Sequence, residues 1–172
     1  SCLVGSEMCI RDRRTIVPVV RLTGMIAAES GGIGRKALSM ATVEPLLDKA
    51  FEIKDAPVVA IEVNSPGGSP VQSRLIFRRI RELAEKHDRK VLVFCEDVAA
   101  SGGYMIACAG DEIVADPSSI VGSIGVVSGG FGFVDLIRRI GVERRLYTAG
   151  RNKATLDPFS PEKPEDCLLY TS

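Results

Sequence analysis

The chain has 172 residues, and its 22 Lys and Arg balance 22 Asp and Glu, so the formal net charge is zero. This length suits one domain with a sizeable core, and a content of 45% hydrophobic residues excludes a disordered chain. The charge balance argues against nucleic acid as the main partner, because phosphate binding needs a basic excess on some face. No run approaches the roughly 18 apolar residues that a membrane-spanning helix requires.

The two ends of the chain differ from its middle. Residues 1–13 show neither helical nor strand periodicity, and both this segment and residues 167–172 resemble translated sequencing-adapter sequence. We expect non-native tails around a domain over 14–166 that is truncated at its C-terminal side, with natural disordered tails as the alternative. Within this domain Cys95 and Cys108 lie in apolar segments, which predicts small buried thiols. Their spacing does not match a metal site.

The first half of the domain alternates strands and helices. A β-branched run predicts a strand over 17–22, and apolar residues at helical spacing predict a helix over 43–51. Residues 57–63 are nearly all apolar, which is typical of a strand buried on both faces of a parallel sheet. Ser69 is a suitable N-cap for a helix over 70–86 that has proline as its first residue.

The second half continues the same alternation. We expect strands over 90–95, 112–115 and 142–148, and a helix over 133–140. Residues 101–109 are apolar on all sides, which predicts a helix buried deep in the fold. Repeated strand–turn–helix units of this kind indicate an α/β layered fold with a mostly parallel sheet flanked by helices.

The first of three glycine-rich turns is Asn-Ser-Pro-Gly-Gly at 64–68, between a buried strand and a helix. Its two glycines can adopt positive φ and leave backbone N–H groups pointing into a cleft, where they could bind an anion or an oxyanion. A tight turn without any ligand has the same composition. The glycines alone therefore leave both interpretations open.

The second turn, Ala-Ala-Ser-Gly-Gly at 99–103, places the Ser101 hydroxyl at the start of a helix. The free N–H groups and the helix dipole would stabilise developing negative charge there. Ser101 is thus either a nucleophile, with the Gly102 N–H as an oxyanion donor, or a simple N-cap. The third turn, Val-Gly-Ser-Ile-Gly at 121–125, could be purely structural.

A nucleophilic serine needs a base, and the sequence offers few. His87 is the only histidine, and it continues the apolar stripe of the 70–86 helix, so we expect it to border the core. No histidine follows Ser101. The remaining candidate is Lys153, which could act as a base only if its surroundings lower its pKa toward neutrality. On its own, Lys153 is typical of a solvated loop.

Taken in order, the three turns and the segment around Lys153 resemble the signal peptide peptidase A family of serine peptidases, the SppA and SohB group. The resemblance covers roughly residues 16–166. It implies the ClpP/crotonase fold and a Ser–Lys dyad. By this resemblance Ser101 is the nucleophile, Lys153 the general base, and Ser123 the residue that orients the lysine amine. The same resemblance makes the N–H groups of Gly102 and Gly68 the donors to the oxyanion, with Gly67 as the alternative to Gly68.

The resemblance also implies a substrate class and partners. We expect hydrolysis of signal-peptide remnants or other hydrophobic or unfolded peptides, without a cofactor or metal ion. A homo-oligomer is expected, because assembly would help to keep the lysine neutral. The resemblance also implies a location at the bacterial cytoplasmic membrane, and we expect membrane association to belong to the full-length protein rather than to this segment. No nucleic acid partner is expected.

Three other classes compete with this interpretation. A catalytically inactive relative would keep the fold and act as a scaffold or binding subunit. A crotonase-type acyl-CoA enzyme would need a basic patch for CoA and a pair of carboxylates near the oxyanion amides, and the sequence offers no clear pair. A mononucleotide-binding protein would need a phosphate loop such as GxxxxGK[ST], which is missing.

Overall fold

The computed structural model describes residues 16–28, 37–125, 129–149 and 156–163. The chain forms two compact units, residues 1–124 and 125–172, and each is described by itself. The tails expected over 1–13 and 167–172 lie outside the described residues, and so does Lys153.

Among the described residues of the first unit, five strands form one sheet in which every paired strand runs parallel to its neighbour. The order β1-β2-β3-β4 follows the chain, and β5 pairs with the end of β3. This confirms the α/β fold with a parallel sheet. The strands are β1 (Val19–Thr23), β2 (Val58–Ser65), β3 (Lys90–Ala100), β4 (Glu112–Ala115) and β5 (Ile120–Gly122).

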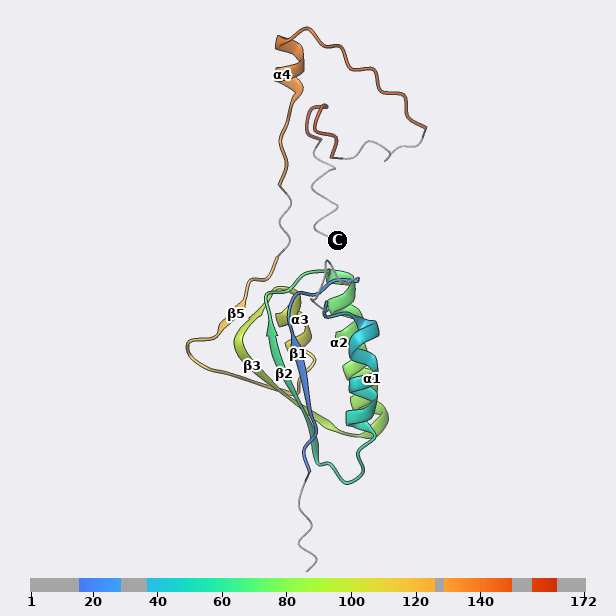
Figure 1. The fold of residues 1–172 in the computed structure, drawn as a ribbon, viewed down its shortest axis with the longest axis vertical. Coiled ribbons are helices and arrows are strands. Elements are labelled where there is room, and N and C mark those ends of the chain that lie inside the picture. Colours follow the sequence, from blue (N-terminus) through green and yellow to red (C-terminus); the bar gives the residue numbers. More distant parts are fainter. Residues whose placement is uncertain (1–15, 29–36, 126–128, 150–155, 164–172) are drawn as a thin grey trace, which may run out of the picture. The chain divides into compact units, whose positions relative to one another are not determined.

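Three helices connect these strands: α1 (Met40–Phe51), α2 (Pro70–His87) and α3 (Gly102–Ala107). α1 and α2 lie side by side along one side of the sheet (Figure 1). α2 begins as the sequence predicts, because the Ser69 hydroxyl accepts a hydrogen bond from the Gln72 N–H and proline occupies the first helical position. His87 ends α2 with its ring 6.2 Å from that of Phe51, at the border of the core.

The core lies between the sheet and the helices. Alternate residues of β1, β2 and β3 point into it, which is the period-two pattern of a strand with one covered face. The expectation that 57–63 is buried on both faces holds for Ala60 but is wrong for Glu62, which lies on the same face, is only partly buried and pairs with Arg21 at 2.5 Å. The largest fully buried side chains are Phe51, Leu22, Ile26, Leu47, Ile61, Ile76, Ile80 and Ile106.

Several sequence-based boundaries differ from the structure. β3 continues beyond Cys95 to Ala100, and β5 occupies residues expected in a turn. Residues 142–148 form no strand, because a strand needs a partner for its backbone groups and none pairs with them among the described residues. Cys95 is buried as predicted, whereas Cys108 follows the short helix α3 and is exposed.

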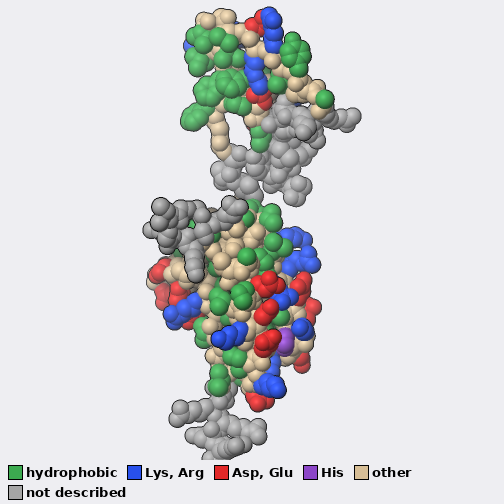
Figure 2. Space-filling model, turned by 45° about the vertical axis from the view of Figure 1, so that its right-hand side comes forward, with side chains coloured by type: hydrophobic (Ala, Val, Ile, Leu, Met, Phe, Trp, Pro, Cys, Tyr) green, Lys and Arg blue, Asp and Glu red, His purple; other side chains and the backbone are tan. Residues whose placement is uncertain are grey.

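Charged side chains of both signs are interspersed on the face that carries α1 and α2 (Figure 2). Several of the ion pairs join elements far apart in the chain. Arg79 of α2 pairs with Asp48 of α1 at 2.7 Å, and Arg81 of α2 pairs with Asp111, just before β4, at 3.0 Å. The second of these pairs ties the C-terminal half of α2 to the sheet.

The second unit has one described helix, α4 (Val134–Arg139), and none of its residues is buried. The Phe133 N–H donates to the Pro158 carbonyl at 2.7 Å, and the Phe133 and Phe159 ring centroids lie 5.5 Å apart. Arg144 pairs with Asp157, and this bond, followed by the Ser160 hydroxyl, lowers the pKa of Asp157 to about 2. These contacts fold 156–160 back onto 133–144.

Two neighbouring leucines of α1 provide a test of the core. Leu47 is fully buried, whereas Leu46 is 50% exposed. We expect Leu47→Ala to lower the free energy of unfolding by about 2–5 kcal/mol, because it removes buried methyl groups and leaves a cavity. Leu46→Ala should change it by only about 0.5 kcal/mol. Urea unfolding followed by circular dichroism measures both, and equal losses would contradict the placement of α1.

Asp111 makes the stability depend on pH. Its pKa is lowered, chiefly because the Val91 N–H donates to its carboxylate at 2.8 Å, with the Arg81 guanidinium adding to the effect. Since the folded-state pKa lies below the unfolded one, the ionised carboxylate stabilises the fold above about pH 4, and this is lost as the pH falls through the folded pKa. We expect Asp111→Asn to be destabilising near neutral pH and progressively less so in acid. Urea unfolding over a pH series measures this difference, and a constant value would contradict the role of Asp111.

Candidate active site

The first glycine-rich turn leaves β2 and enters α2. Gly67 and Gly68 have φ values of +100° and +143°, as expected for a turn that only glycine adopts easily. Gly68 also lies against the backbone of Ile26, since an added Cβ would be 2.0 Å from the Ile26 carbonyl oxygen. Both glycines are therefore required by backbone geometry.

The N–H groups of this turn can be accounted for one by one. Pro66 has no backbone N–H. The Gly67 N–H donates to the Ser65 hydroxyl at 3.1 Å, and the Ser69 N–H donates to the Ile26 carbonyl at 2.8 Å. The Gly68 N–H has no acceptor among the described residues. An amide left free in this way is available to a ligand.

Ser101 joins β3 to α3 with a φ of +51° and a ψ of −116°. For a residue other than glycine, such a conformation costs on the order of 1–3 kcal/mol and persists only where the surroundings impose it. The Ser101 N–H donates to the Gly122 carbonyl at 2.7 Å, which holds the turn from the β5 side. The Ser101 side chain makes no capping bond to the helix, so its hydroxyl is available for chemistry.

The two turns pack backbone against backbone. An added Cβ on Gly67 would lie 2.8 Å from the Ala100 carbonyl oxygen and 2.9 Å from the Gly102 nitrogen. An added Cβ on Gly103 would lie 2.6 Å from the Ser65 carbonyl oxygen. The structure thus brings Ser101, Gly102 and the 64–68 turn together at the carboxyl edge of β2 and β3.

The third turn lies beside the second, because Gly122 accepts the bond from Ser101. Ser123 follows it with a φ of +54° and an exposed side chain. The structure therefore places Ser123 one residue from the backbone partner of Ser101. The proposed base, Lys153, lies outside the described residues.

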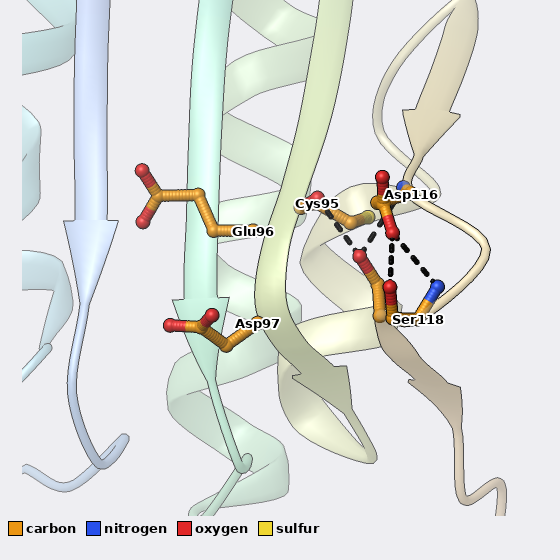
Figure 3. A pocket seen from close by; sticks show the side chains of 6 residues that line it. Cys95, Glu96, Asp97, Asp116 and Ser118 are labelled. Atoms are coloured by element: carbon orange, nitrogen blue, oxygen red, sulfur yellow. Dashed lines mark hydrogen bonds between the residues drawn. The ribbon is translucent and has the colours of Figure 1, made fainter.

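An open cavity of about 410 Å³ lies between β3 and the β4–β5 connection (Figure 3). Glu96 and Asp97 point to one side of β3, away from Cys95 and Asp116. The Ser118 hydroxyl and N–H both donate to Asp116 and lower its pKa. Ser101 does not line this cavity, and the described residues contain no group of three or more His, Cys, Asp or Glu arranged to bind a metal ion.

Tyr104 of α3 interacts with two cysteines, Cys108 at the end of the same helix and Cys95 of β3. The pKa of Tyr104 is raised, first by the charge of Cys108 and then by a hydrogen bond with that thiol. The pKa of Cys95 is also raised, mainly by burial. Both groups therefore stay protonated near neutral pH, and neither supplies a base for Ser101.

The sequence of the chain is similar to those of known peptidases. The family model for peptidase family S49 matches residues 84–168, a segment that includes Ser101, Ser123 and Lys153. The chain is 32% identical over 161 residues to the chloroplastic serine protease SPPA of Arabidopsis thaliana, covering 91% of this chain and 23% of that protein. The chain belongs to the SppA/SohB-like peptidase family.

The chain is also similar to a longer bacterial protein and to a solved structure. A Brucella melitensis protein named Na(+)/H(+) antiporter NhaA is 68% identical over 157 residues, covering 91% of this chain and 21% of that protein. A solved structure of a mutant of the 1510-N membrane-bound stomatin-specific protease shares the fold, with a TM-score of 0.50 and 22% identity over 67% of this chain and 50% of that one.

The chain spans about a fifth of the length of the Brucella and Arabidopsis proteins. Across the described residues, no helix of this family member has both the length and the apolar content to cross a membrane.

The contact between Gly68 and Ile26 predicts a difference between two glycines. We expect Gly68→Ala to lower the free energy of unfolding by about 1–3 kcal/mol more than Gly24→Ala does, because its Cβ would overlap a carbonyl oxygen. Gly24 is the matched control, since it also has a positive φ, +107°, but open space around it. Urea unfolding measures both variants. Equal losses would show that the loop does not pack on Ile26 as described.

Proposed function

We propose that this chain hydrolyses peptide bonds with Ser101 as the nucleophile and Lys153 as the general base. The observation that carries the proposal is the meeting of the uncapped Ser101 hydroxyl with the turn that holds the free Gly68 N–H. A serine beside two backbone amides at the start of a helix can form a tetrahedral oxyanion and stabilise it.

The reaction follows from these groups. Neutral Lys153 takes the proton of the Ser101 hydroxyl as its oxygen attacks the carbonyl carbon of the substrate. The Gly68 and Gly102 N–H groups donate to the oxyanion, with Ser123 orienting the lysine amine. The leaving amine takes up the proton, and water then releases the acyl group from Ser101 by the same steps.

The substrate class is inferred from the family. We propose hydrophobic or unfolded peptides, including remnants of signal peptides, as substrates of the whole protein. A lysine stays neutral only in surroundings that disfavour its charge. We therefore also propose that the active form is a homo-oligomer, whose contacts would shield Lys153 from water.

Substitution of the two proposed catalytic residues tests the mechanism. We expect Ser101→Ala and Lys153→Ala each to lower kcat for a hydrophobic fluorogenic peptide by roughly a thousandfold or more. Lys153→Arg should also be inactive, because arginine keeps its proton. In the wild-type protein kcat should rise with pH as Lys153 loses its proton.

Ser118→Ala is a control for loss of a serine elsewhere, since Ser118 is exposed and bonds only Asp116 among the described residues. Circular dichroism verifies that each variant is folded. Wild-type activity that survives Ser101→Ala would refute the catalytic assignment. Equal, negligible rates from folded and assembled wild type and variants would instead favour the inactive binding subunit.

A further inference from the structure

Ser65 is the last residue of β2 and is fully buried. Its hydroxyl accepts the Gly67 N–H at 3.1 Å, the one bond from a side chain to residues 66–68 in the described part of the chain. We propose that Ser65 is a positioning residue that selects Gly68, rather than Gly67, as the oxyanion donor. This inference rests on the proposed peptidase function and adds a residue that does not touch the substrate.

Ser65 is enclosed by two neighbouring segments, the strand β3 and the start of α3. The residue pairs with Ala99 of β3, so its backbone is fixed within the sheet. On its other side Gly103 lies so close that an added Cβ would be 3.2 Å from the Ser65 Cβ. Because the Ser65 side chain is enclosed, its hydroxyl oxygen has a fixed position from which it accepts the Gly67 N–H.

This fixed acceptor is one of two contacts that orient the turn, and the other comes from Ile26. The Gly67 N–H points inward to Ser65, and the Gly67 carbonyl accepts the Ile26 N–H at 2.9 Å. Both polar groups of Gly67 are thus bound within the protein, which fixes the peptide planes on either side of its Cα. The Gly68 N–H is left as the turn's one unpaired donor among the described residues.

Without the Ser65 oxygen, the Gly67 N–H would be buried and unpaired, which is unfavourable. The turn would then rotate until the Gly67 N–H finds another acceptor. One such acceptor is the substrate oxyanion. Such rotation would move the Gly68 N–H away from the position it needs for the transition state. Ser65 has no access to a substrate, so its effect passes through the turn.

Hydrogen exchange tests the positioning without relying on activity. In Ser65→Ala we expect the Gly67 amide to exchange about tenfold faster or more by NMR, because its acceptor is gone. The Ile61 amide in the middle of β2 reports any loss of global stability, and its exchange should change much less. Ser39→Ala is the matched control, since Ser39 is also a buried serine but caps α1. Unchanged Gly67 exchange in Ser65→Ala would overturn the inference.

Kinetics test the consequence for the oxyanion. We expect Ser65→Ala to lower kcat for an ester substrate about 10- to 100-fold with KM nearly unchanged. The thiono analogue of the ester has sulfur in place of the carbonyl oxygen, and sulfur is a poor hydrogen-bond acceptor. The preference for the ester over this analogue should therefore also fall, because a displaced Gly68 N–H no longer favours oxygen. Ser65→Cys, with similar volume but a weak acceptor, should not restore the rate. Ser39→Ala should leave kcat and the preference unchanged.

The outcomes separate the two proposals. Wild-type hydrolysis that depends on Ser101, with an unchanged kcat and oxygen preference in Ser65→Ala, would overturn the role of Ser65 and leave the peptidase intact. A wild-type protein that hydrolyses nothing would refute the peptidase proposal, and with it the role of Ser65 in catalysis. The exchange of the Gly67 amide would still decide whether Ser65 orients the turn.

Discussion

The site depends on the contact between two turns whose glycines let the two backbones touch. Parallel strands bring the ends of β2 and β3 to the same edge of the sheet, and each strand leads into a turn and a helix. Gly67 lies against the Ala100 carbonyl, and Gly103 lies against the Ser65 carbonyl, at distances that no Cβ could share. Because the backbones touch, the amides of one turn come within reach of the serine on the other. Any side chain added here would push Ser101 away from the amides of the 64–68 turn.

An irregularity in β3 makes this arrangement compatible with a single sheet. Val63 pairs with Cys95, yet Ser65 pairs with Ala99, so β3 has extra residues opposite Asn64. Such a bulge bends the strand and changes which way its side chains point, and Glu96 and Asp97 accordingly lie on the same side (Figure 3). The Asn64 side chain spans the bulge by donating to Asp97 at 2.9 Å. Before the bulge β3 pairs with β4, and after it with β5. One strand thus joins the core of the sheet to the turn at Ser101.

Local signals in the sequence account for the parts of the fold that local physics determines. Ser69 and the proline after it specify the start of α2, and the glycines at 67 and 68 adopt the positive φ that their composition indicates. The sequence does not predict β5, because a three-residue strand is defined by its pairing with β3 rather than by its own composition. Nor does it indicate that Ser65 is an acceptor. A buried serine becomes recognisable only when the donor above it has been placed.

The Ser101 turn illustrates how local strain and global packing are combined. The hydroxyl of a serine before a helix ordinarily accepts a hydrogen bond from a free N–H of the first turn. The Ser101 side chain makes no such bond. The strain and the lost cap are offset elsewhere, because Ile106 and Ala107 of α3 are fully buried and Gly122 accepts the Ser101 N–H. α3 is too short to be stable by itself. Its apolar packing therefore holds the serine in a conformation that the isolated segment would avoid, and the hydroxyl remains uncapped.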